Sequence, residues 1–178
     1  MNIGIFAAST RRLDRVIEQA RAAAEDGFSS FWLPQVAGLD ALTAIALAGR
    51  EVAGIGFGTA VVPIQPRHPQ VLASQALTVQ AAIGGRLALG VGLSHQFVVE
   101  HLWGLPWDRP VRRMRDYLDA LLPLLSGELV EIRSGTVTCV GSVRVADVEA
   151  PTVLLAALGP RMLRLAGERA AGTVTWCT

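Results

Sequence analysis

Residues 85–95 read GRLALGVGLSH, a short apolar run that ends in a glycine-rich turn. The part from Leu87 to Val91 has the uninterrupted apolar character of a strand that is covered on both faces. It predicts a buried parallel strand that leads into the turn Gly90-Val91-Gly92. Ser94 and His95 lie just after this strand, at its carboxyl end, which is the end where α/β-barrel enzymes keep their sites.

Five further apolar runs flank this strand and alternate with helical patterns. The expected strands before it are Ile3–Phe6, Phe31–Leu33 and Ile55–Val62, and those after it are Val153–Ala157 and Thr173–Trp176. Alternating strands and helices of this length predict an α/β fold with a parallel sheet and right-handed crossovers. The pattern alone leaves open whether the sheet is doubly wound or closed into a barrel.

The segments between the strands have helical periodicity and recognisable ends. Asp40 is expected to cap the second helix, and Pro69 suits the first turn of the third. A longer helix is expected over Pro110–Leu125, and Gly127 ends it. Short alternating stretches at about residues 126–150 then predict a small hairpin-like insertion within a single domain, residues 1–178.

Composition excludes several classes of protein. Of the 178 residues, 51% are hydrophobic and 17% are charged, which argues against disorder. The formal net charge is +1 and the arginines are scattered, so the basic stripe of a nucleic-acid-binding protein is absent. The longest apolar run, Val52–Ile64, is shorter than the ~18 residues of a membrane span. Cys139 and Cys177 fit no disulfide framework or metal spacing, and we expect a cytoplasmic protein without a membrane or nucleic-acid partner.

Several segments resemble, in order, the luciferase-like monooxygenase superfamily, and in particular its branch of coenzyme F420 (deazaflavin)-dependent oxidoreductases. They are GFSSFWLP (27–34), GTAVVP (58–63) followed by RHP (67–69), GRLALGVGLSH (85–95), AALGPRM (156–162) and AGTVTW (171–176). The resemblance implies a TIM-type (β/α)8 barrel, whereas six strands are counted here. We therefore expect a barrel truncated after about six strands, whose two unpaired edges favour a homodimer or higher oligomer.

The resemblance also implies a cofactor site at the ends of the third and fourth strands. It places a non-prolyl cis peptide at Ala60–Val61, pressed against the tricyclic ring; the alternative is an ordinary trans strand end. It places Gly92 and Ser94 beside the ring and the ribityl chain, since Gly92 permits close backbone approach and Ser94 can hydrogen-bond. The alternative for Ser94 is a helix cap.

After the fifth strand, the resemblance implies a phosphate site at Gly159, Arg161 and Met162. The amino-terminal N–H groups of a helix favour an anion, and Arg161 adds charge. The alternative is a Gly-Pro turn that only starts a helix.

The identity of a proton-transferring residue is less defined. Many relatives carry a histidine or an acid at the end of the second strand, where this chain has Gln35-Val36. Gln35 can hydrogen-bond a ring edge or a substrate oxygen but cannot exchange a proton at neutral pH. His95 is the other catalytic candidate, held evenly against a surface role, and Glu100 and His101 are expected behind the site. For Arg67 and His68 we favour structural roles.

The function expected from the resemblance is hydride transfer between coenzyme F420 and a small organic substrate. An FMN-dependent monooxygenase is the alternative enzyme. A truncated, non-catalytic flavin-binding remnant is the alternative outside the enzymes.

Overall fold

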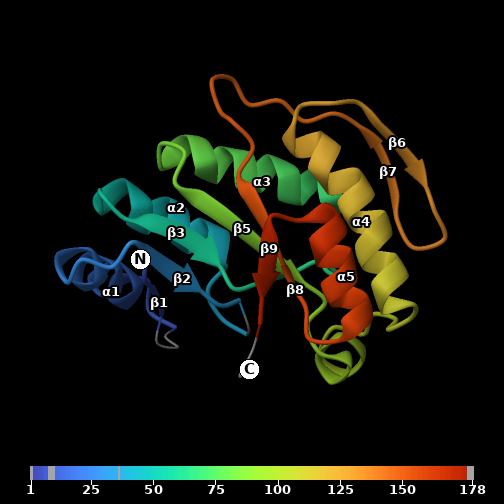
Figure 1. The fold of residues 1–178 in the computed structure, drawn as a ribbon, viewed down its shortest axis with the longest axis horizontal. Coiled ribbons are helices and arrows are strands. Elements are labelled where there is room, and N and C mark those ends of the chain that lie inside the picture. The colour runs from blue at the N-terminus through green and yellow to red at the C-terminus, as the bar shows by residue number, and fades with distance from the viewer. Residues whose placement is uncertain (1, 8–10, 36, 176–178) are drawn as a thin grey trace.

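The computed structural model describes residues 2–7, 11–35 and 37–175, which form a parallel sheet with helices around it (Figure 1). The strands of the sheet lie in the order β1-β2-β3-β5-β8-β9, and the short β4 also pairs with β5. Their bounds are β1 Gly4–Phe6, β2 Ser30–Leu33, β3 Gly56–Thr59, β4 Val62–Pro63, β5 Leu87–Gly92, β8 Thr152–Ala156 and β9 Gly172–Val174. The expected strand at the carboxyl end is confirmed up to Val174, while Trp176 lies outside the described residues.

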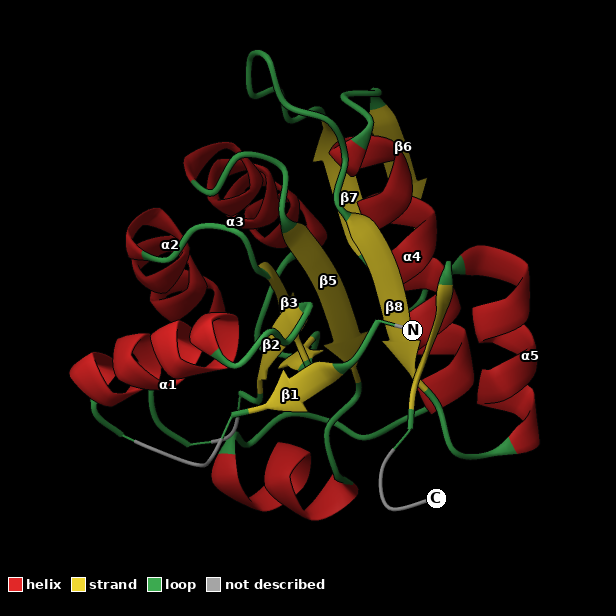
Figure 2. Cartoon of the chain, turned by 60° about the vertical axis from the view of Figure 1, so that its left-hand side comes forward, coloured by secondary structure: helices red, strands yellow, loops and turns green. Residues whose placement is uncertain are grey.

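The helices range around the outside of the sheet, as in a barrel that is not closed (Figure 2). Neighbours along the chain pack against each other, α1 on α2, α2 on α3, α3 on α4 and α4 on α5. Their bounds are α1 Leu13–Glu25, α2 Ala41–Glu51, α3 Pro69–Ala82, α4 Pro110–Leu125 and α5 Pro160–Arg169. The truncated α/β barrel expected from the sequence is therefore confirmed for the described part of the chain.

The two faces of the sheet differ in side-chain size. The face toward the helices carries large buried side chains, among them Phe31 and Phe57, whose rings meet edge to face. The opposite face, here called the inner face, carries mostly small residues. From register, it comprises Gly4, Phe6, Ser30, Trp32, Gly56, Gly58, Ala88, Gly90, Gly92, Thr152, Leu154, Ala156, Gly172 and Val174. In a closed barrel this space is filled with layers of branched side chains. Here Ala88 and Ala156 are half-buried and Phe6 is 44% exposed.

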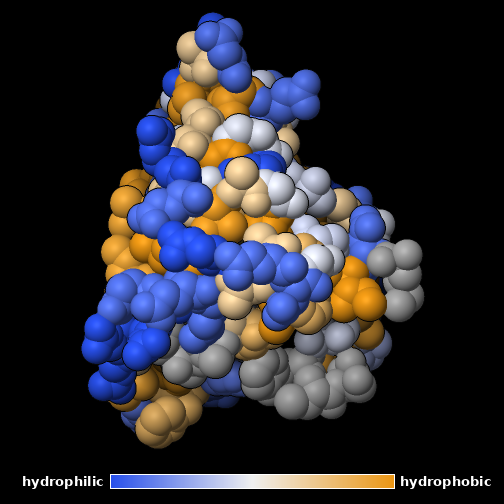
Figure 3. Space-filling model, turned by 90° about the vertical axis from the view of Figure 1, so that its left-hand side faces the viewer, coloured by the Kyte–Doolittle hydropathy of each residue, from blue (hydrophilic) through white to orange (hydrophobic). Residues whose placement is uncertain are grey.

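The outer surface carries ion pairs between neighbouring helical turns and between helices. On α1, Arg15 pairs with Glu18, and Arg21 pairs with Glu51 of α2. Figure 3 shows the side of the molecule that lies on the left in Figure 1, where hydrophilic residues predominate and hydrophobic patches lie between them. In the part of the chain that the structure describes, no helix is long and apolar enough to cross a membrane.

The third strand differs from the expectation. We expected one strand over Ile55–Val62, and the structure divides it into β3 and β4. Phe57 and Gly58 face Leu87 and Ala88 of β5, whereas Val62 and Pro63 face Val91 and Gly92. The three residues 59–61 therefore oppose only residues 89 and 90, which is a β-bulge, a feature that is common beside active sites. Within this bulge the bond Ala60–Val61 is cis, as the resemblance implied.

Asp40 joins the start of α2 to the region of α3. Its Oδ1 accepts hydrogen bonds from the Thr43 N–H (2.8 Å) and from Gln75 Nε2 (3.0 Å), and its Oδ2 pairs with Arg67. Burial works to raise the pKa of the Asp40 carboxyl, but the Thr43 hydrogen bonds and the Arg67 charge outweigh it, so the pKa is lowered. The expected capping role of Asp40 and the structural role of Arg67 are confirmed.

His68 has a structural role as well. Its Nδ1 accepts the Gln70 N–H (3.2 Å) and caps α3, and its Nε2 lies 2.8 Å from the Thr138 carbonyl oxygen. Thr138 belongs to the antiparallel hairpin of β6 (Val130–Arg133) and β7 (Thr138–Gly141), which lies within the residues where the sequence predicted a hairpin-like insertion. His68 thus fastens the hairpin to α3.

Arg86 braces the opposite end of the sheet, just before β5. Its guanidinium donates to the carbonyl oxygens of Gly49 (2.6 Å), Val52 (3.1 Å) and Ile55 (2.6 Å), and its Nε donates to that of Ile83 (2.8 Å). These carbonyls lie at or just beyond the carboxyl ends of α2 and α3, where a cation is favoured by the helix dipole.

Candidate functional site at the carboxyl edge of the sheet

Thr59 fixes the bulge to β5. Its side chain is fully buried, and its Oγ1 donates to the Gly90 carbonyl oxygen (2.8 Å) and accepts from the Gly90 N–H (2.9 Å). The hydroxyl thus takes the place of the ladder hydrogen bonds that the bulge removes. A Cβ atom on Gly90 would lie 2.0 Å from the Thr59 carbonyl oxygen, so this close approach requires glycine.

Val61 lies directly over Gly92. A Cβ atom on Gly92 would lie 2.5 Å from Val61 Cγ2 and 3.0 Å from Ala156 Cβ. The structure therefore brings together three of the predicted site residues, Ala60, Val61 and Gly92, and adds Ala156 of β8. The result is a tightly packed shelf of small apolar groups at the carboxyl end of the inner face.

Ser94 occupies a conformation that is unusual for a residue other than glycine. Its φ is 63°, in the left-handed region, and its side chain is half-buried. The preceding residue, Leu93, accepts a hydrogen bond at its carbonyl oxygen from Gln65 Nε2. Helical structure resumes only at Gln96, so the alternative that Ser94 caps a helix is not what the structure shows.

The segment after Ser94 contains a π-helix, η1 (Val98–Leu102), which the sequence did not indicate. His95 is the first residue of this segment and is exposed, and its carbonyl oxygen accepts the Val99 N–H (3.0 Å). His101 is also exposed, and its ring lies 4.9 Å from that of Phe97. His95 therefore adjoins Ser94 at the carboxyl edge, whereas His101 lies farther along the segment.

Gln35 is engaged in local structure. Its Oε1 accepts the Ala41 N–H (3.2 Å) at the first residue of α2, beside the cap made by Asp40. The neighbouring Val36, which the sequence analysis considered with it, lies outside the described residues.

The first turn of α5 is exposed and has no side-chain cap. Gly159 is the N-cap residue without a capping hydrogen bond from a side chain, Pro160 follows it, and Arg161 is exposed. Met162 differs from the expected arrangement, because its side chain is 9% exposed and packs in the hydrophobic core. Gly159 and Arg161 are thus accessible for an anion, and Met162 supports the helix from inside.

Electrostatically, the inner face is neutral. None of the described residues on this face has an ionisable side chain. Its polar side chains are those of Ser30, Trp32 and Thr152, and the Trp32 indole N–H donates to the Ser30 hydroxyl (2.9 Å). Trp32 lies across Gly58, whose added Cβ would meet the indole at 2.2 Å. The indole therefore covers Gly58 on the inner face, between β2 and β3.

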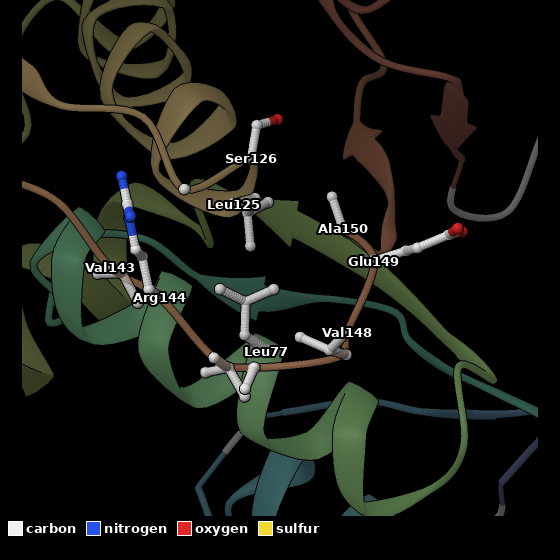
Figure 4. Close-up of a pocket in the computed structure, with 11 residues that line it drawn as sticks. Leu77, Leu125, Ser126, Val143, Arg144, Val148, Glu149 and Ala150 are labelled. Atoms are coloured by element: carbon white, nitrogen blue, oxygen red, sulfur yellow. The ribbon is translucent and has the colours of Figure 1, made fainter.

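A separate hollow of about 770 Å³ lies between α3, the end of α4 and the segment that precedes β8 (Figure 4). The residues that line it include Leu77, Leu125, Arg144, Val148, Glu149 and Ala150. It lies near the amino end of β8, at the opposite end of that strand from Ala156, so it does not belong to the candidate site.

Comparison with known proteins decides the family. The family model for luciferase-like monooxygenases matches residues 1–178. The chain belongs to the luciferase-like monooxygenase family. It is 38% identical over 99 residues to a Mycobacterium tuberculosis protein provisionally named a coenzyme F420-dependent oxidoreductase, covering 55% of this chain and 28% of that protein. It is 24% identical over 175 residues to a 5,10-methylenetetrahydromethanopterin reductase of Methanolobus tindarius, covering 98% of this chain and 53% of the relative.

Solved structures share the fold of this luciferase-like chain. The coenzyme F420-dependent tetrahydromethanopterin reductase of Methanopyrus kandleri matches with a TM-score of 0.86 at 22% identity, over 98% of this chain and 55% of that one. The oxygenating constituent of 3,6-diketocamphane monooxygenase of Pseudomonas putida, in complex with FMN, matches with a TM-score of 0.79 at 18% identity, over 95% and 55%. The chain spans about half the length of most of these proteins.

Sequence reasoning missed three residues that shape this luciferase-like site: Thr59, Trp32 and Gln65. A buried threonine before a strand end gave no signal of its role, because its partner Gly90 is 31 residues away. Trp32 was recognised only as part of the second strand, and Gln65 was not singled out.

Proposed function

We propose that this chain binds a deazaflavin of the coenzyme F420 type on its inner face and serves hydride transfer between that cofactor and a small organic substrate. The observation that carries the proposal is the shelf of Val61, Gly92 and Ala156 beside the uncapped first turn of α5. The names of the Mycobacterium tuberculosis relative and of the Methanopyrus kandleri reductase, which both state dependence on coenzyme F420, support a deazaflavin over other cofactors.

The residues present fit such a cofactor. A planar ring needs a flat, apolar surface, and Val61, which packs over Gly92 and beside Ala156, provides one. A phosphate needs N–H donors and positive charge, and the first turn of α5 offers both through its backbone and Arg161. The proposed site thus extends over the carboxyl ends of the neighbouring strands β5 and β8, whereas an isolated glycine turn would offer only one of these contacts.

The bound deazaflavin supplies the hydride chemistry, and the chain supplies position and proton handling. The Ser94 hydroxyl can hydrogen-bond the cofactor next to Gly92. His95 is the proposed proton-transferring group, because it adjoins Ser94 and the inner face has no ionisable side chain. Gln35 is proposed to orient a substrate oxygen through its Nε2, since its Oε1 is used by Ala41.

Titration of the purified chain with coenzyme F420 and, separately, with FMN tests this proposal. Saturable binding of F420, weakened in Arg161→Gln and unchanged in Arg144→Gln, an exposed control outside the candidate site, is the expected result. Binding of FMN without F420 would overturn the deazaflavin assignment and favour a flavin-dependent monooxygenase, a possibility kept open by the FMN-bound neighbour of the same fold. Binding without turnover would identify the chain as a non-catalytic flavin-binding unit.

A further inference from the structure

Gln65 connects the ends of β4 and β5 beside the proposed cofactor site. Pro63 pairs with Gly92, the Ile64 N–H donates to the Gly92 carbonyl oxygen (3.0 Å), and Gln65 Nε2 donates to that of Leu93. Residues 63–65 thus contact residues 92–93 in succession, and the last of these contacts lies next to Ser94. The amide orientation follows from the contact itself, because only the nitrogen can donate to a carbonyl oxygen.

Two locally unfavourable features meet at this point. The Oε1 atom of Gln65 is buried and has no hydrogen-bond partner among the described residues. Ser94 is held at φ 63°, where a side chain is crowded. Each feature costs free energy, and such features persist where the surrounding structure maintains them, often at functional sites.

We propose that Gln65 is a positioning residue that holds the Leu93–Ser94 turn in the conformation that presents Ser94 to the cofactor. This inference rests on the proposed function. By fixing the Leu93 carbonyl, the Gln65 amide restricts the peptide that precedes Ser94, and the direction of the Ser94 hydroxyl follows from that peptide. Gln65 therefore acts on the cofactor through Ser94 and need not touch it.

A double-mutant cycle on cofactor binding tests the inference. The variants are Gln65→Met, Ser94→Ala and the pair, each titrated with coenzyme F420 and, if F420 does not bind, with FMN. Loss of one hydrogen bond predicts about a tenfold rise in Kd for Ser94→Ala and a rise of up to the same size for Gln65→Met. The double variant should bind no more weakly than Ser94→Ala alone, because both changes remove the same interaction.

Two further variants separate positioning from a general effect on folding. Gln65→Glu keeps the side-chain length but loses the N–H donor, so it should weaken binding as Gln65→Met does. Gln19→Met is the matched control, because Gln19 on α1 also has a buried Oε1 without a partner among the described residues. It should leave Kd unchanged. Thermal unfolding without ligand should change little in Gln65→Met, since the variant also removes a buried unpaired acceptor.

The outcomes are distinct. Unchanged Kd in both Gln65 variants, or additive effects of Gln65→Met and Ser94→Ala, would overturn the positioning role while leaving the proposed function intact. Failure of the unaltered chain to bind either cofactor would overturn the proposed function, and this inference with it.

Discussion

We expect the Thr59 hydroxyl to stabilise the bulge between β3 and β4. Thr59→Val tests this, because valine has nearly the same side-chain shape without the hydroxyl. Valine replaces the hydroxyl with a methyl group in a site that is fully buried. It leaves the Gly90 N–H and carbonyl without the partners they have at 2.9 and 2.8 Å. The change therefore isolates the two hydrogen bonds from the packing of the side chain.

The expected magnitude follows from these two groups. A buried polar group that loses its partner costs about 1–3 kcal/mol, so Thr59→Val should lower the free energy of unfolding by about 2–6 kcal/mol. Thr59→Ser is the matched control, since it keeps both hydrogen bonds and loses one methyl group, worth about 1 kcal/mol. A chain of this size shifts its Tm by about 2–4 °C per kcal/mol, so the two variants are well separated.

Urea unfolding followed by circular dichroism measures both variants, and flavin or deazaflavin titration reports on the site. Thr59→Val should also weaken cofactor binding, because the bulge carries Val61 over Gly92. If Thr59→Val and Thr59→Ser unfold within about 0.5 kcal/mol of each other, the hydroxyl does not support the bulge and the reasoning is wrong.

Three further predictions concern the site, the Asp40 contact and assembly. Gly92→Ala should raise the cofactor Kd about tenfold or more, because its Cβ would displace Val61; equal titration curves would contradict this. Asp40→Asn should destabilise the chain at pH 7, and its difference from the unaltered chain should shrink as pH falls below the usual carboxyl pKa toward the lowered folded pKa of Asp40, as urea unfolding over a series of decreasing pH values would show. The chain should form at least a homodimer, since β1 and β9 are edges of the described sheet and Ile3 is 52% exposed; a monomer mass by light scattering would refute it.

Local signals predicted most of the fold. Asp40 and His68 are N-caps because their side chains accept hydrogen bonds from N–H groups two or three residues ahead, which is a short-range property of the sequence. The alternation of apolar runs with helical periodicity likewise identified the strands, because each covered strand is a continuous apolar segment.

Features that depend on distant partners were not predictable from these signals. The apolar run Ile55–Val62 looks continuous, and only the register with β5 reveals the bulge within it. Met162 stands next to Arg161 in the motif, yet helical geometry turns it into the core. The resemblance located the strand ends that form the site, and the structure decided which side chains face it.

The Arg86 brace has a consequence for how this scaffold can change. One guanidinium gathers four backbone carbonyls at the end of the sheet remote from Ser94 and Gly159, and backbone carbonyls are present whatever the side chains are. Helices α2 and α3 are thereby anchored independently of the loops at the carboxyl edge. The loops at the carboxyl edge can therefore be replaced, by evolution or by grafting, without disturbing the Arg86 contacts that hold α2 and α3.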